Sequence, residues 1–244
     1  DIFNLQVGGP WRDLRRLIYC GEWIESHVLH IYMLHAPDFL GYQDAIRLAK
    51  DAPDIVKRGL RLKKVGNELM TVLGGREIHP INLKIGGFYR LPEKSELMAL
   101  KPELEWSVEA ARETVRWVSQ FEFPDLERDY EYVALKHEHE YAIHEGRLVS
   151  NRGLDIPVSE FETHFEEEHV ARSTALHSVH KGFGSYLVGP MARYNLNFEQ
   201  FSDDVKAEAE RAGLVRACHN TFKSIVIRAL EALYVCQEAL KLIE

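Results

Sequence analysis

The chain has 244 residues, of which 45% are hydrophobic and 28% are charged, as in an ordinary soluble globular protein. Thirty Lys and Arg against 38 Asp and Glu give a formal net charge of −8, which argues against nucleic acid as a partner. No apolar run approaches the ~20 residues that span a bilayer, and no signal peptide is visible. Three scattered cysteines do not suggest a disulfide framework, which favours a protein from a reducing compartment.

The first predicted element is a long helix that starts near Pro10. Pro37 and Gly41 are expected to end it, because proline and glycine commonly terminate helices. Apolar residues recur along it at helical spacing, which predicts one buried face. The residues on that face are Leu14, Leu17, Ile18, Ile24, Val28, Ile31 and Leu34.

Residues 25–30 interrupt this apolar pattern with charge and histidine. Polar groups in an apolar setting cost free energy unless they are paired. His27 and His30 are three residues apart and therefore share one face of the helix. On this pattern alone, we interpret them as core histidines that pair with backbone or with a carboxylate.

Two further helices are predicted before residue 75: a short one at 43–51 and a longer one from Asp54 to Leu73, which Gly74 and Gly75 end. The longer helix has an apolar stripe and a basic face. That face is expected to be solvated, with contact to an acidic partner as the alternative. Its cations are Lys57, Arg58, Arg61, Lys63 and Lys64.

The next segment, residues 76–88, is predicted to be extended. His79 precedes Pro80, which favours an extended backbone at His79. Glycine pairs at 74–75 and 86–87 bracket the segment and permit close backbone approach. This pattern indicates either backbone packed against a bulky group or an ordinary connection between a helix and a strand.

A further helix is predicted from Glu103 to Phe121, followed by a change in composition. Residues 130–137, 140–144 and 147–149 alternate and carry Tyr and Val, which predicts short antiparallel strands. We interpret residues 137–139, with sequence His-Glu-His, as a polar hairpin surface, since no clear third metal ligand accompanies the two histidines.

Residues 157–168 resemble the start of a helix, with Ser159 and Glu162 forming a capping box. Histidines His177 and His180 would share a face if their segment were helical, but no carboxylate at suitable spacing completes a site. Residues 183–197 are rich in Gly, Tyr and Asn, which indicates a buried irregular segment.

A short helix is expected to end at Ala212, and a long last helix to run from about Leu214 to Ile243. The apolar residues of this last helix have the three–four spacing of a packed bundle. Cys218 and Cys236 are 18 positions apart on it, too distant to bind one ion together. Like Cys20, they are not predicted to be metal ligands, and their expected role is that of small apolar residues.

These elements predict a mainly α fold that forms a single domain over residues 1–244. Long helices would pack as a bundle, and a small antiparallel β region at about 130–157 would be inserted between them.

Three stretches resemble motifs of one enzyme family. Residues 25–39 read Glu-Ser-His-x-Leu-His-x-x-x-Leu-His-Ala-Pro-Asp-Phe, and residues 74–88 read Gly-Gly-Arg-x-x-His-Pro-x-Asn-x-x-x-Gly-Gly-Phe. Together with residues 171–176 and 185–193, they resemble the large (alpha) subunit of nickel–iron hydrogenases, in particular its cytosolic branch. This resemblance covers nearly the whole chain and implies the same fold: a helical core with a peripheral sheet.

The resemblance implies that the parent enzyme interconverts dihydrogen with protons and electrons, in the cytoplasm. Its cofactor would be a nickel–iron centre with cyanide and carbonyl ligands. Its partners would be a small subunit that holds iron–sulfur clusters and further electron-transfer subunits. The resemblance also implies a set of side chains that surround the metal ligands and orient them. These surrounding side chains are Ser26, His27, His30, Arg76 and His79.

The family binds its metals through four cysteines in two Cys-x-x-Cys motifs, and this chain has no such motif. Thiolates suit a soft metal centre, so we expect no catalytic residue and no cofactor within these residues. The chain is therefore expected to be the central part of a large subunit, inactive by itself. Exposed apolar surface would make the isolated chain self-associate.

Two other functions remain open on the sequence. The quinone-site subunit of respiratory complex I shares this fold and lacks the metal cysteines. It resembles the chain around the His-Pro-Asn block, but less well at Glu25-Ser26-His27. A scaffold that kept the fold and lost the site is the non-enzymatic alternative.

Overall fold

The computed structural model describes residues 5–214 and 216–244. The α-helices are α1 (Pro10–Leu29), α2 (Ala36–Phe39), α3 (Ala45–Asp51), α4 (Pro53–Gly74), α5 (Lys94–Ala99), α6 (Lys101–Val118), α7 (Phe161–His164), α8 (Pro190–Asn197), α9 (Asp203–Arg211) and α10 (Ser224–Ile243). The strands are β1 (Leu83–Lys84), β2 (Gly87–Phe88), β3 (Val133–Lys136), β4 (Arg147–Ser150), β5 (Asp155–Ile156), β6 (Phe165–Glu168) and β7 (His177–His180).

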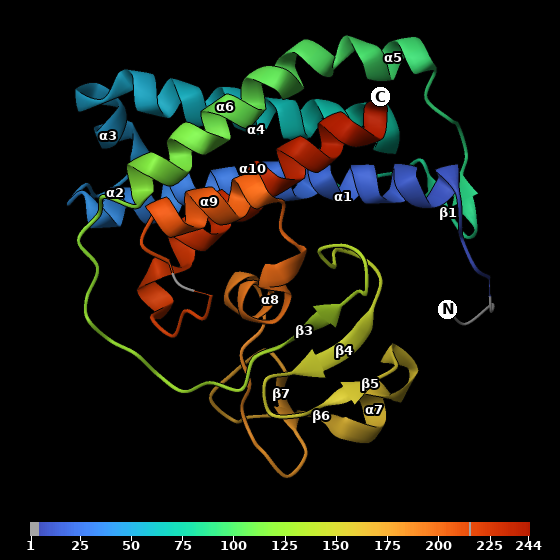
Figure 1. The fold of residues 1–244 in the computed structure, drawn as a ribbon, viewed down its shortest axis with the longest axis vertical. Helices are drawn as coiled ribbons and strands as arrows, with labels where there is room; N and C mark the ends of the chain where they lie inside the picture. Colours follow the sequence, from blue (N-terminus) through green and yellow to red (C-terminus); the bar gives the residue numbers. More distant parts are fainter. Residues whose placement is uncertain (1–4, 215) are drawn as a thin grey trace.

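The long helices α1, α4, α6 and α10 pack together as a bundle, in which α1 contacts α4 and α10, and α6 contacts α10 and α4. The β region lies to one side of this bundle (Figure 1). The strands form three small antiparallel sheets, ordered β1-β2, β3-β4-β5 and β6-β7. The predicted mainly α fold with a small antiparallel β region is therefore confirmed. The main hydrophobic core lies between the helices, and a second, smaller apolar cluster joins Val133, Ile156 and Phe165 of the sheets.

The first helical stretch ends at Phe39, just before Gly41, as the sequence predicted, but Pro37 does not terminate it. It continues from α1 through a π-helix at His30–His35 into α2, with Pro37 in the first turn of that helix, where a missing N–H costs little. Leu34, expected in the core, lies within the π-helix, whose wider turn changes the helical spacing, and is 57% exposed.

The prediction that residues 157–168 form a helix was wrong over most of its length. After a 3-10 turn at Val158–Glu160 and the single turn α7, residues Phe165–Glu168 form β6, which pairs with β7. The N-cap of α7 is Glu160, without a side-chain cap. Burial of Phe165 on the strand overrides the local helix signal.

Four other segments also differ from the prediction. The last helix begins at Ser224 rather than near Leu214, so Cys218 lies in the irregular segment before it. Residues Pro190–Asn197 form α8 rather than irregular chain, because Gly189 at φ +86° turns the chain so that Pro190 can begin a helix. Residues 140–144 form a loop, and the helix α5 was not predicted.

The basic face of α4 is neutralised within the chain. Its cations form ion pairs with carboxylates of the same chain, which are Lys57–Asp54, Arg58–Glu113, Arg61–Glu103, Lys63–Glu25 and Lys64–Glu68. The solvated-face interpretation therefore fits better than an acidic partner.

Helices α1 and α4 approach so closely that glycine is required between them. A Cβ on Gly66 would lie 2.7 Å from the backbone N of Glu25 and 2.7 Å from the backbone O of Gly21. Such distances are too short for real carbon contacts, so the helices would have to separate. This pairing holds residues 25–30 in a fixed position against α4.

We predict that Gly66→Ala destabilises the protein by roughly 1–2 kcal/mol, because the clash outweighs the higher helix propensity of alanine. Urea unfolding followed by circular dichroism measures this change. Gly8→Ala is the control, since a Cβ there meets nothing within 4 Å. Equal stability of the two variants would contradict the required close approach.

Candidate functional site

The histidine block on α1 faces a buried carboxylate from the end of the chain. Nε2 of His27 lies 2.7 Å from Oε2 of Glu231, which projects from α10 and is fully buried. The guanidinium of Arg193 on α8 binds the same carboxylate through Nε and Nη2, both at 2.7 Å. The hydroxyl of Tyr141 donates to Oε1 at 2.7 Å. One carboxylate thus joins α1, α8, α10 and the loop after β3.

The hydrogen bonds fix the charge of each group in this cluster. Burial by itself would raise the pKa of Glu231, but the charge and hydrogen bonds of Arg193 and the hydrogen bond of His27 hold that pKa well below its usual range. Nη1 of Arg228 lies 3.3 Å from Nδ1 of His27 and can only donate. His27 is therefore neutral and carries its proton on Nε2, in agreement with the pKa of His27, which burial lowers.

A second buried cation continues the network along α1. Arg16, only 1% exposed, donates to Glu238 at 2.7 Å, to the Tyr234 hydroxyl at 2.9 Å and to the backbone oxygen of Tyr141 at 3.1 Å. One turn earlier, Arg12 forms ion pairs with Glu140 and Glu145. The loop at 140–145 is therefore ordered by arginines of α1 rather than by strand pairing.

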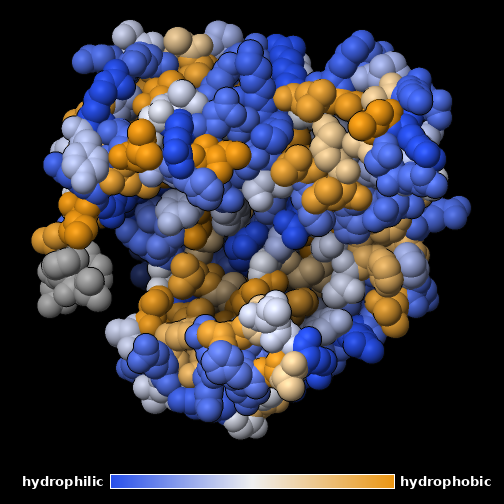
Figure 2. Space-filling model, turned by 180° about the vertical axis from the view of Figure 1, so that it is seen from behind, coloured by the Kyte–Doolittle hydropathy of each residue, from blue (hydrophilic) through white to orange (hydrophobic). Residues whose placement is uncertain are grey.

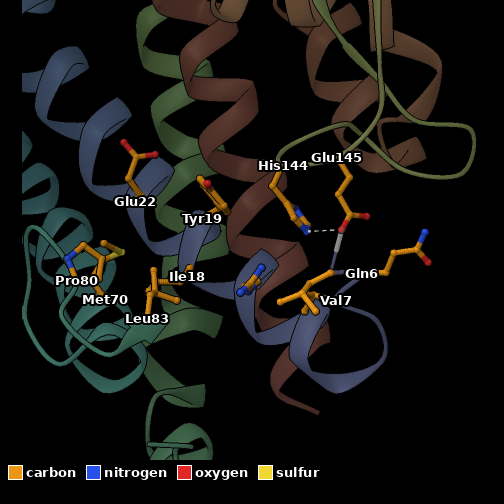
Figure 3. Close-up of a pocket in the computed structure, with 12 residues that line it drawn as sticks. Gln6, Val7, Ile18, Tyr19, Glu22, Met70, Pro80, Leu83, His144 and Glu145 are labelled. Carbon is orange, nitrogen blue, oxygen red and sulfur yellow. Dashed lines mark ion pairs between the residues drawn. The ribbon is translucent and has the colours of Figure 1, made fainter. Parts of the chain in front are cut away.

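A cavity of about 850 Å³ opens beside this network. It is lined by residues 5–7, by α1, by Met70 of α4, by Pro80 and Leu83 after α4, and by His144 and Glu145, most of which Figure 3 labels. Tyr19 stacks on His144, whose two ring nitrogens are buried and lack hydrogen-bond partners in the described part of the chain. Figure 2 shows the molecule hollowed between its helical and β-containing parts.

Two side chains that line the cavity have shifted pKa values. Burial and the nearby Glu25 carboxylate raise the pKa of Glu22. Burial lowers the pKa of His144, despite Glu145, whose Oε1 lies 3.6 Å from its Nε2. Both shifts favour the neutral form: the raised pKa of Glu22 moves toward neutral pH, whereas the lowered pKa of His144 keeps its imidazole uncharged there.

The structure does not gather the five sequence-predicted site residues in one place. Ser26 is half-buried beside His27, and His30 turns toward a different pocket with His35. Arg76 and His79 are exposed in the loop after α4, near the other end of α1. The role of all five residues around a metal centre remains a prediction.

The predicted extended backbone at His79 was wrong. His79 has φ +54°, the one positive φ outside glycine among residues 5–214 and 216–244. Nε of Arg76 lies 2.6 Å from the backbone oxygens of both Ile78 and His79. These hydrogen bonds offset the strain that a left-handed residue before proline would otherwise carry.

The cysteines do not fit a nickel–iron centre. Cys20, Cys218 and Cys236 are all buried, and burial raises the pKa of the Cys236 thiol to about 12. A metal ligand must be a thiolate, which this environment disfavours. Across the described ranges, no group of three or more His, Cys, Asp or Glu side chains is placed to hold a metal ion.

Sequence reasoning missed the charged residues that α10 contributes to this network. Arg228, Glu231 and Glu238 interrupt the apolar stripe of the last helix at helical spacing. A charged residue inside an apolar stripe signals a buried ion pair. Arg193 and Tyr141 gave no comparable signal, because their partner is set by the fold.

Comparison with known proteins identifies related chains, although no family model matches. The alpha chain of sulfhydrogenase 1 from Pyrococcus furiosus is 30% identical over 233 residues, 95% of this chain and 54% of that protein. A component of the vhu F420-non-reducing hydrogenase from Methanocaldococcus jannaschii is 27% identical over 217 residues, 80% of this chain and 52% of that protein. This chain is a homologue of hydrogenase large subunits.

Solved hydrogenase structures share the fold of this large-subunit homologue. An NAD+-reducing [NiFe]-hydrogenase in the H2-reduced state matches 97% of this chain and 59% of its own, with a TM-score of 0.83 and 20% identity. The Ni-Fe-Se hydrogenase of Desulfovibrio vulgaris Hildenborough matches 99% of this chain and 63% of its own, with a TM-score of 0.69 and 17% identity. The chain spans about half the length of the curated relatives it matches.

We predict that Glu231→Gln destabilises the protein by about 3–5 kcal/mol, because it leaves the buried Arg193 without a counter-charge. Urea unfolding at neutral pH measures the effect. Glu210→Gln on α9 is the matched control, at an exposed position where the change should stay within about 0.5 kcal/mol. A loss below about 1 kcal/mol for Glu231→Gln would show that the network is not a main support of the core.

Proposed function

We propose that this chain is the central portion of the catalytic large subunit of a cytoplasmic nickel–iron hydrogenase. That enzyme is an oxidoreductase that interconverts dihydrogen with protons and electrons. The observation that carries the proposal is the alignment with the alpha chain of the sulfhydrogenase over 95% of this chain. The fold shared over 97% of this chain supports it, and we treat residues 1–244 as a single domain.

We propose that the metal ligands come from outside these residues. The buried thiols and the dispersed histidines do not supply the donor set of a nickel–iron centre with cyanide and carbonyl ligands. By itself, this chain would bind no nickel and would be inactive.

The contribution of this chain would be a rigid polar frame. The Glu231 network fixes His27 in one tautomer and thereby fixes the turn of α1 that also carries Ser26 and His30. The hydrogen bonds of Arg76 hold the loop that carries His79. Such side chains orient groups that are brought to them.

The partners would be a small subunit with iron–sulfur clusters and further electron-transfer subunits. Relatives are named as subunits, among them the beta chain of the NAD-reducing hydrogenase HoxS from Cupriavidus necator. No helix within residues 5–214 and 216–244 is long and apolar enough to cross a membrane.

The first test is anaerobic purification of the large subunit to which these residues would belong, together with its bound partner subunits. We predict nickel and iron in the complex, dihydrogen-dependent dye reduction, and neither property for the isolated chain. In the complex, Ser26→Ala and His79→Gln should each lower activity by about 10–100-fold.

Ser95→Ala and His139→Gln are the matched controls, at exposed positions away from both motifs. A complex without nickel would refute the proposal and favour a scaffold or a quinone-site subunit. Unchanged activity of both site variants would instead refute only their assigned role.

We also predict that the isolated chain self-associates. The loop after α4 and its hairpin expose apolar side chains, which are Ile78, Ile81, Leu83, Ile85, Tyr89 and Leu91. Light scattering should give a dimer or a larger species, and Ile81→Ser with Ile85→Ser should shift it toward monomer. Ile46→Ser on α3, which is 75% exposed but outside this hairpin, is the control. A monomeric wild-type chain would contradict the prediction.

A further inference from the structure

A second pocket, of about 390 Å³, lies at the other end of α1 from the large cavity. It is formed by the π-helix, α2 and the start of α10. Its polar lining consists of His30, His35, Asp38, Thr221, Ser224 and Arg228. Neither sequence motif nor the proposed hydrogenase activity accounts for the arginine in this group.

Arg228 differs from the other arginines of the core in its partners. Arg16 and Arg193 each bind a carboxylate at 2.7 Å. In the described part of the chain, Arg228 forms no ion pair, and its buried Nε–H has no acceptor. Burial lowers the pKa of Arg228 although the charge of Glu231 acts in the opposite direction, as expected for a cation removed from water without a carboxylate in contact.

The free side of this guanidinium has the geometry of a carboxylate receptor. Nη1 is directed to Nδ1 of His27 at 3.3 Å, and the guanidinium also lines the pocket without a carboxylate partner among the described residues. Arginine binds a carboxylate with strong charge-assisted hydrogen bonds. The hydroxyls of Thr221 and Ser224 line the same pocket.

The two histidines complete the lining as neutral groups. Nε2 of His30 lies 3.3 Å from Nδ1 of His35. Burial, Arg228 and the neighbouring histidines lower the pKa of His30 to about 4. Burial and Arg228 also lower the pKa of His35, despite Asp38. The pocket therefore holds one cation, Arg228, and one carboxylate, Asp38.

Asp38 restricts the charge of the ligand. It forms no ion pair with Arg228 in the described residues, so it does not neutralise the guanidinium directly. Its own charge would repel a dianion such as phosphate more strongly than a monoanion. We propose that this pocket binds a single carboxylate, held by the guanidinium of Arg228.

The carboxylate has two possible sources with the same chemistry. One is a small free carboxylic acid, and the other is an Asp or Glu side chain of a partner subunit. This assignment does not depend on the hydrogenase proposal, because it rests only on the unpaired guanidinium and the lining of its pocket.

The test is a titration of the ¹⁵N-labelled chain with acetate, followed through the imidazole signals of His30 and His35. We expect saturable shifts with acetate, weaker ones with phosphate and none with chloride at equal ionic strength. Arg228→Met should weaken acetate binding by about tenfold or more, and Arg228→Lys should weaken it less, since an ammonium lacks the fork.

The Asp38→Asn variant should change the acetate affinity in the opposite direction from the Arg228 variants, which a purely structural role of these residues would not produce. Removing its charge should tighten acetate binding by about threefold to tenfold. Arg47→Met, an exposed arginine on α3, is the control and should leave binding unchanged. If Arg228→Met fails to fold, Arg228→Lys and Asp38→Asn still decide the question.

A second titration, on the protein purified with its partner subunits, separates the two sources. Binding to the isolated chain but not to the complex would assign the carboxylate to a partner side chain, and binding to both would assign it to a small acid. Absence of saturable shifts in the isolated chain would overturn the proposal. Equal acetate affinity of wild type and Arg228→Lys, together with no gain in Asp38→Asn, would overturn it too.

Discussion

Glu231 is a full negative charge at the centre of an apolar helical core, and much of the arrangement around it follows from the need to compensate that charge. Arg193 supplies the counter-charge, while His27 and Tyr141 supply two more hydrogen bonds. Because a buried carboxylate with a missing partner is costly, the four segments that carry these groups are tied to one relative position. The network therefore specifies geometry as well as contributing stability.

The pairing of Glu231 also fixes the histidine block at residues 25–30. With Glu231 accepting from Nε2 and Arg228 donating to Nδ1, His27 has one tautomer and one ring orientation. On the opposite side of α1, Gly21 and Gly66 allow α4 to pack backbone against backbone. Residues 25–30 are thus held from both sides, as a frame for an externally supplied metal centre would require.

The chemistry of the chain is divided between positions that are satisfied and positions that are not. The carboxylate of Glu231 is fully paired. By contrast, His144 in the large cavity and Arg228 in the small pocket are among the side chains that keep buried nitrogens without hydrogen-bond partners in the described residues. Unsatisfied buried groups are rare in folded proteins, so the lining of these two hollows is where a bound ligand would gain hydrogen bonds.

Helices whose apolar spacing is continuous were predictable from the sequence. Those at 43–51, 54–73 and 103–121 match α3, α4 and α6 within about three residues, and the antiparallel region at 130–157 matches β3, β4 and β5. The errors occurred where particular hydrogen bonds, rather than apolar spacing, accompany the conformation. Pairing with β7 makes Phe165 part of a strand despite a capping signal, and two local hydrogen bonds from Arg76 accompany the left-handed conformation of His79.

The sequence by itself determined the mainly helical class, the family resemblance and the absence of a Cys-x-x-Cys pair, because each is a matter of residue type and local spacing. Only the tertiary structure decided that His27 pairs with Glu231, 204 positions away, and that Arg228 is left unpaired among the described residues. The physical reason is that the partner of a buried charge is chosen by which side chains the folded helices bring within hydrogen-bond distance. Local spacing does not encode that choice.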